Sequence, residues 1–205
     1  MNDFDTTAAT RQQASPQIPS SSASRTHASV APGGNELPAT LKADCSRCAG
    51  LCCIVPAFYA VQGFGFDKPA HTPCLHLTGA GRCTIHAELS SRGFSGCRAF
   101  DCYGAGQRVT QEIFPGISWR ASDEAAADIF SAYTCLFALH RLMALLATAE
   151  AALPPPFTSQ MSSMRRQLDE LCRAKGRSPA SLDLGRLERE TMSSIREAYK
   201  RATER

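Results

Sequence analysis

Cysteines dominate the chemistry that this sequence offers. Eight of the ten lie between Cys45 and Cys102, and the first four form the pattern C-x2-C-x3-C-C. The eight are Cys45, Cys48, Cys52, Cys53, Cys74, Cys83, Cys97 and Cys102. A C-x2-C pair can point two sulfurs at one metal, and four thiolates form the usual closed zinc site or anchor an iron–sulfur cluster. We therefore predict all eight as metal ligands, with zinc or an iron–sulfur cluster as the cofactor.

Two details of the spacing bear on how the sulfurs are shared. Gly50 lies between the second and third cysteines, where a tight ligand turn often needs positive φ. Cys52 and Cys53 are adjacent, and in an extended backbone their side chains would point to opposite faces. They are then expected either to serve two different sites or to leave one of them packed in the core.

Disulfides and redox-active thiols are the competing interpretations. An even number of closely spaced cysteines also suits a secreted domain held by disulfides. The first residues, MNDFD, lack the basic region and the apolar run of a signal peptide. This start predicts a cytoplasmic protein with reduced thiols, and there clustered cysteines indicate metal binding or catalysis.

Several other side chains are secondary candidates. His76 and His86 follow cysteines closely, and either could ligate a metal, but four thiolates already complete a site, so both are interpreted as lying beside it or as exposed. His140 is expected as a hydrogen-bonded core residue, with donation to a bound thiolate as the alternative. Cys135 and Cys172 lie on predicted helices and are expected to be small core residues.

Basic residues are also frequent near these cysteines. They are Lys42, Arg47, Arg82, Arg92 and Arg98. Four thiolates on one zinc ion carry a net −2 charge, which such cations would stabilise, and the same cations would stabilise reactive free thiolates.

Composition gives few other functional indications. The formal charge is +3, and it would become −1 if eight thiolates added −8 and two zinc ions added +4. The interleaved basic and acidic residues of the C-terminal helices are typical of solvated helix faces, so nucleic-acid binding is not expected. The sequence shows no independent enzyme signature, and the G-x-G at Gly104 lacks the third glycine of a dinucleotide site.

The chain divides into three parts. Residues 1–40 are rich in Ser, Thr, Ala, Gln and Pro and are predicted to be a disordered tail. Residues 41–120 form the Cys-rich metal-binding domain, and residues 121–205 are helical. We predict a mostly α protein in which a small, irregular, metal-centred domain packs on a C-terminal bundle of about three helices.

The helices are predicted from apolar periodicity and capping residues. The first should run from Ser122 to Leu153 with Ser122 as its cap, and its charged residues argue against a membrane span. The others should cover 159–175, with Thr158 as cap, and 182–201. In the Cys-rich part, 55–66 is expected as a strand or hairpin and 85–92 as a short helix. Aromatic residues of the first helix should cover those of 58–66, and the helices should offer a platform for a protein partner.

The cysteine pattern resembles the CxxCxxCC family. The residues that carry the resemblance are C-x2-C-x3-CC, then Cys74, then GRCTI at 81–85 and GCRAF at 96–100. That family is described as a zinc- or iron-chelating domain. This sequence departs from it with three residues between Cys48 and Cys52, and with His86 where the family usually has Tyr.

A closer resemblance is to the Cys-rich N-terminal region of bacterial, mostly actinobacterial, pentapeptide-repeat proteins. It extends over residues 43–200 and is carried by DCSRCAGLCC, FDKPAHTPC and RGFSGCRAFDCYGAGQRVTQ. The repeats themselves are absent from this sequence. A broader relative by cysteine pattern is the flagellin lysine-methylase group, whose cysteines are linked to an iron–sulfur cluster. The expected function is thus a cytoplasmic metal-binding protein with a non-catalytic binding or adaptor role. An iron–sulfur modification enzyme and a thiol redox sensor remain open.

Overall fold

A computed structural model describes residues 36–176 and 181–204 of the chain. Most of the predicted disordered tail, residues 1–35, lies outside this range. Near the start of the described residues, Leu37 and Leu41 are buried in the main core. The two residues therefore belong to the packed body, and the short turn Ala39–Leu41 holds the second of them there.

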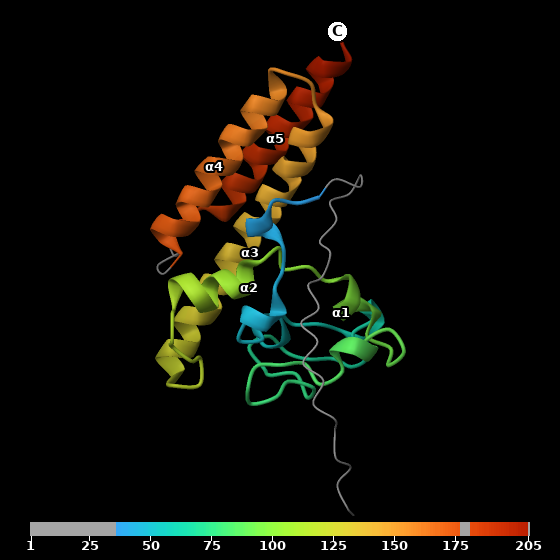
Figure 1. The fold of residues 1–205 in the computed structure, drawn as a ribbon, viewed down its shortest axis with the longest axis vertical. Helices are drawn as coiled ribbons and strands as arrows, with labels where there is room; N and C mark the ends of the chain where they lie inside the picture. Colours follow the sequence, from blue (N-terminus) through green and yellow to red (C-terminus); the bar gives the residue numbers. More distant parts are fainter. Residues whose placement is uncertain (1–35, 177–180, 205) are drawn as a thin grey trace, which may run out of the picture.

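Three helices form the C-terminal bundle, as predicted. They are α3 (Asp123–Ala152), α4 (Phe157–Lys175) and α5 (Leu184–Thr203). Figure 1 shows α4 and α5 packed beside the C-terminal half of α3, while the N-terminal half of α3 extends alongside the Cys-rich part. The protein is mostly helical, which confirms the predicted fold class.

The helix ends follow from local hydrogen bonds. The Ser122 hydroxyl accepts from the backbone N–H of Ala125 at 3.1 Å, as predicted, and the Asp183 carboxylate caps α5 in the same way through Arg186 at 2.8 Å. Thr158 was predicted to cap α4, but it lies inside the helix. The helix α4 begins at Phe157, two residues earlier than predicted, and the Thr158 hydroxyl donates to the Leu153 carbonyl at 2.8 Å.

The helix α3 is the central element of the core. It is long and apolar enough to cross a membrane, but 67% of its most apolar window is buried inside the protein. It packs against α4, α5, α2 and the turn at Ala39–Leu41. Its apolar surface is therefore covered by other parts of this chain, as expected for the core helix of a bundle.

Short elements build the Cys-rich part. Helices α1 (Ser95–Ala99) and α2 (Ala105–Arg108) are joined by a loop, and a π-helical turn, Val109–Ile113, continues α2. Among the residues that the structure describes there is no strand. The predicted hairpin over 55–66 is wrong, since only an isolated bridge joins Phe58 to Lys68, and the helix predicted over 85–92 is reduced to one turn at His86–Glu88.

Two apolar cores hold the molecule. The main core is shared, because Leu51 and Ile54 of the Cys-rich part pack in it with Leu136 and Leu139 of α3. A smaller core of Ile85, Leu89 and Phe94 lies under the Cys-rich loops.

Aromatic contacts between the two parts differ from those expected. Phe130 of α3 stacks on His71 with ring centroids 5.3 Å apart and lies 6.0 Å from Trp119, and Phe137 lies 5.3 Å from Phe100. The aromatic residues of 58–66 instead pack on one another and on Phe94. The α3 aromatics thus cover later loops of the Cys-rich part.

Candidate metal centre

All ten cysteines carry free thiols. Cys135 on α3 and Cys172 on α4 are buried in the main core among apolar residues, as predicted. The other eight lie in the Cys-rich part and fall into two sets of four.

The first thiol set surrounds a small cavity of about 20 Å³. Its members are Cys45, Cys48, Cys52 and Cys102, and the remaining wall comes from Ala43, Asp44, Gly106 and Gln107. Three of these cysteines lie in two short 3-10 turns, Cys45–Arg47 and Leu51–Cys53, or directly after the first. Cys102 comes from the loop before α2, so two segments far apart in sequence meet here.

Glycines allow this close approach. Gly50 has φ +76° at the start of the second turn, as its position predicted, and Gly104 has φ +77° before α2. A Cβ on Gly106 would lie 2.6 Å from the Cys48 sulfur, so only glycine lets α2 pack so closely on that sulfur.

Backbone N–H groups point at two sulfurs of the first set. Leu51 and Gly50 donate to Cys48, and Gly106 and Gly104 donate to Cys102. Hydrogen bonds of this kind favour the charged form of the acceptor. The turns thus supply donors that suit thiolates, which are the form that binds metal.

The second thiol set comprises Cys53, Cys74, Cys83 and Cys97. The backbone N–H of Cys74 donates to the Cys53 carbonyl at 2.9 Å, and an isolated bridge places Cys83 opposite Leu77. Cys83 and Cys97 both pack against the smaller core. The second set also has donors: the N–H of His76 lies 3.4 Å from the Cys74 sulfur, and the N–H of Ile85 donates to Cys83.

Cys52 and Cys53 connect the two sets. Their sulfurs lie 4.0 Å apart. The expectation from an extended backbone is wrong, because both residues lie in the 3-10 turn Leu51–Cys53 and their side chains do not point to opposite faces. Cys52 packs against the main core, but both sulfurs lie beside other thiols.

Burial keeps most of these thiols neutral without a metal. It raises the pKa of Cys45 and of Cys97 to about 12 and that of Cys48 and of Cys83 to about 11. Cys53 is different: its pKa is lowered by the hydrogen bond that Cys52 donates and, more weakly, by the charge of Lys68. A buried set of thiols ionises at neutral pH only if a cation compensates the charge.

Lys68 is a buried cation that sequence reasoning missed. It is 3% exposed, and its Nζ donates to the carbonyls of Ile54, Pro56 and Pro69 at 2.8–3.0 Å. It also lies 4.6 Å from the centre of the Phe58 ring. Its charge acts on Cys53 and Cys74 of the second set. The sequence places it in the FDKPAHTPC segment, but only the fold shows that the ammonium is held inside.

Tyr133 is a second residue that the sequence did not single out. Its side chain is 2% exposed, and its hydroxyl has no hydrogen-bond partner. Burial raises its pKa well above the usual value, and the charges of Cys52, Cys102 and Cys48 add to this rise. An unpartnered buried hydroxyl is costly, so a missing acceptor beside the first set is indicated.

The predicted secondary candidates have other partners. The His76 ring packs edge-on against Phe94 at 5.2 Å, and buried His140 lies 2.6 Å from the Tyr103 carbonyl and 3.3 Å from Arg108 Nη1. His140 is thus a hydrogen-bonded core residue, and its ring nitrogens bond to groups other than a thiolate. His86 lies in the turn His86–Glu88.

Three of the predicted surrounding cations have other partners. Lys42 pairs with Glu36 and Arg92 with Glu88, while the Arg82 guanidinium donates to the carbonyls of Cys45 and Ser46. Arg82 precedes Cys83, so it ties the chain of the second set to the first turn of the first set. The buried cation Lys68 acts on Cys53 and Cys74 from inside the fold.

The sulfurs are near one another but are not arranged as a coordination sphere. Within residues 36–176 and 181–204, no group of three or more His, Cys, Asp or Glu side chains already has the geometry to hold a metal ion. The donor types, the burial, the N–H donors and the cavity in the first set nevertheless fit a thiolate site. Metal binding would require the sulfurs to move closer by side-chain rotation.

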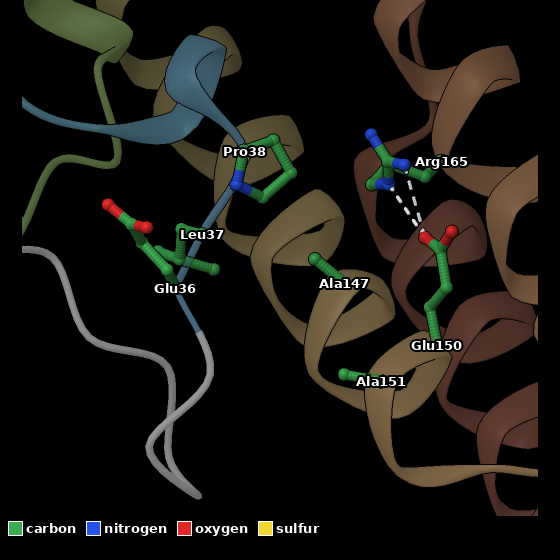
Figure 2. Close-up of a pocket in the computed structure, with 7 residues that line it drawn as sticks. All are labelled: Glu36, Leu37, Pro38, Ala147, Glu150, Ala151 and Arg165. Atoms are coloured by element: carbon green, nitrogen blue, oxygen red, sulfur yellow. Dashed lines mark hydrogen bonds and ion pairs between the residues drawn. The ribbon is translucent and has the colours of Figure 1, made fainter.

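A larger hollow lies far from the thiols. Figure 2 shows it between residues 36–38 and helices α3 and α4. Its volume is about 280 Å³. Its charged lining consists of Glu36 and of the ion pair between Arg165 and Glu150, with Nη2 and Oε2 3.1 Å apart. Because Glu36 pairs with Lys42 and the rest of the lining is mostly apolar, we do not take this hollow as a candidate site for chemistry.

Comparison with known proteins finds a relative of this chain. The chain is 36% identical over 134 residues to "Uncharacterized protein YybG" of Bacillus subtilis (strain 168). The match covers 65% of this chain and 48% of that protein, so the chain spans about half the length of the relative. No protein-family model matches the chain, and no solved structure matches it.

Proposed function

We propose that this chain is a cytoplasmic metal-binding protein that holds zinc through its clustered thiolates. The observation that carries the proposal is the cavity walled by Cys45, Cys48, Cys52 and Cys102. Four thiolates complete a closed structural zinc site. The N–H donors to Cys48 and Cys102 support the thiolate form that such a site requires.

The size of the cavity favours a single ion over an iron–sulfur cluster. About 20 Å³ is close to the space of one water molecule. A four-iron cluster adds four irons and four sulfides between its cysteine sulfurs, and the first set would have to open widely to admit it. One zinc ion needs only that the sulfurs approach to about 2.3 Å from its centre.

We propose a non-catalytic role for this protein, as a binding or adaptor protein. The His76 ring packs against Phe94, and the ring nitrogens of His140 lie against other polar groups, so neither histidine forms an acid–base pair with a thiol. The outer faces of α4 and α5 are rich in exposed charged residues of both signs, and they supply the surface for a protein partner. This proposal also extends the resemblance to CxxCxxCC chelating domains.

Metal analysis tests the proposal. Protein purified without oxygen should be colourless and should contain zinc in stoichiometric amount. Cys45→Ser should lose zinc, whereas the matched core variants Cys135→Ala and Cys172→Ala should retain it. Brown protein that contains iron and sulfide would instead indicate a cluster, and protein without bound metal but with oxidisable thiols would indicate a redox sensor.

A further inference from the structure

We propose that the eight cysteines bind two separate metal ions, one in each thiol set. The first ion is bound by Cys45, Cys48, Cys52 and Cys102, and the second by Cys53, Cys74, Cys83 and Cys97. The inference rests on the proposed function, because it divides the same thiols. The boundary between the two sets of ligands then falls between two adjacent residues, because Cys52 belongs to the first set and Cys53 to the second.

The first set stands apart by its cavity. The four cysteines that line the cavity are those of the first set, and the cysteines of the second set do not contribute to its wall. A closed zinc site uses four ligands, and the first set supplies that number.

Tyr133 gives an independent sign of a ligand at the first set. Its hydroxyl is buried without a partner, and Cys52, Cys102 and Cys48 act on it electrostatically. Its ring also lies close to the Cys48 sulfur, since a Cβ on Gly106 would be 2.6 Å from that sulfur and 3.7 Å from Tyr133 Cε2. A hydroxyl is a natural donor to a metal-bound thiolate, which is a stronger acceptor than a neutral thiol.

The second set has its own structure and its own cation. Cys83 and Cys97 pack on the smaller core, whereas Cys48, Cys52 and Cys102 pack on the main core. The Lys68 ammonium acts on Cys53 and Cys74. A zinc ion with four thiolates carries a net −2 charge, and Lys68 compensates part of it at the second set.

The distance between Cys52 and Cys53 sets the separation of the two ions. With the sulfurs 4.0 Å apart and a zinc–sulfur distance of about 2.3 Å on each side, the ions lie at most about 9 Å from one another. The Arg82 guanidinium reinforces the connection by holding the carbonyls of Cys45 and Ser46 from the loop that leads to Cys83. The two sites are thus neighbours with separate ligands.

The test is a titration of the full chain with cobalt(II), followed by exchange to cadmium-113 for NMR. We expect two equivalents of cobalt with tetrathiolate absorption and two cadmium resonances, both in the range of four sulfur ligands. Cys48→Ser and Cys83→Ser should each retain one equivalent and lose a different cadmium resonance. Cys172→Ala is the control and should retain both.

The outcomes separate this inference from the proposed function. Absence of metal from the wild-type protein overturns both. One equivalent, or one tetrathiolate resonance, overturns the division but leaves a metal-binding protein. Two resonances joined by cadmium–cadmium coupling through a shared sulfur would show a single binuclear cluster and also overturn the division. If either serine variant fails to fold, the number and coupling of the wild-type resonances decide alone.

Discussion

Arg108 of α2 and Asp169 of α4 form an ion pair, with Nη1 and Oδ1 2.7 Å apart. Arg108 is buried and Asp169 is half-buried, so the pair lies largely out of solvent. The same Nη1 lies 3.3 Å from His140 Nε2, and His140 Nδ1 lies 2.6 Å from the carbonyl of Tyr103. This chain of polar contacts joins the residue after Cys102 to two helices of the bundle.

Asp169→Asn should destabilise the protein by about 3 kcal/mol. Removing Asp169 leaves the buried Arg108 guanidinium with only the exposed Glu112 carboxylate, 3.3 Å from Nε, and the loss of one member of a buried pair costs more than the pair itself contributes. Urea unfolding monitored by circular dichroism would measure the loss. The matched control is Glu188→Gln, which breaks the exposed pair between Arg141 and Glu188. That change should cost less than about 1 kcal/mol. Equal effects of the two variants would show that Asp169 does not stabilise the junction.

His140 should make the protein less stable as the pH falls from 6.5 to about 4. Burial lowers the pKa of His140 from 6.5 to about 4, so in this range the unfolded chain binds a proton that the folded protein does not. The stability of the folded state therefore decreases as pH falls through this window and changes no further from this residue below it. The full effect is on the order of 3 kcal/mol.

Acid also releases metal from thiolates, so the effect of His140 must be isolated by comparison. His140→Gln keeps a donor and an acceptor but does not titrate. The difference in unfolding free energy between wild type and this variant should shrink by most of that amount between pH 7 and pH 4. A constant difference over this range would mean that His140 titrates alike in the folded and unfolded states.

Gly106→Ala should selectively disturb the first thiol set. The added Cβ would lie 2.6 Å from the Cys48 sulfur, so the sulfur or helix α2 must move. We expect loss of one metal equivalent and a destabilisation of about 1–3 kcal/mol, the usual cost of overpacking. The control is Gly79→Ala, where a Cβ would have no atom within 4 Å. It should change stability by less than about 0.5 kcal/mol. Full metal content in Gly106→Ala would show that Cys48 is not a ligand or that the turn adapts freely.

The helices could be predicted from the sequence, because their signals are local. Ser122 caps α3 as expected, and the apolar residues of α3 recur at helical spacing and are buried. The start of α4 was predicted two residues too late, because Thr158 is a favoured cap residue whereas Pro156, which precedes the helix, makes no side-chain cap that a sequence pattern could reveal. The positive φ of Gly50 could be predicted for a similar reason, because glycine is the residue that adopts such a φ most readily and the signal is therefore local.

For the Cys-rich part, the sequence predicts which residues are candidate ligands but not how they are arranged in space. Its eight cysteines are visible, but their division depends on contacts between segments such as Cys48 and Gly106, which no local pattern encodes. The burial of Lys68 has the same origin, because three carbonyls from two segments hold its ammonium. A lysine in a polar loop is ordinarily exposed, so no local pattern indicates that this one is buried.

The last prediction concerns coupling between the metal centre and the bundle. Leu51 and Ile54, on either side of Cys52 and Cys53, are fully buried in the core that α3 forms. Metal binding contributes to folding free energy when the ligands are ordered only in the folded state. A chelator should therefore lower the stability of α3 as well as that of the Cys-rich loops.

Hydrogen exchange during chelator titration tests this coupling. Amides of α3 that face the Cys-rich part, around Ala132 to Leu139, should lose protection together with the loops when metal is removed. Amides of α4 that face away serve as an internal reference for direct effects of the chelator. If α3 keeps full protection while the loops exchange freely, the two parts fold independently, and the shared core around Leu51 does not couple them. If protection falls in both at the same chelator concentration, the thiols and the bundle form one cooperative unit.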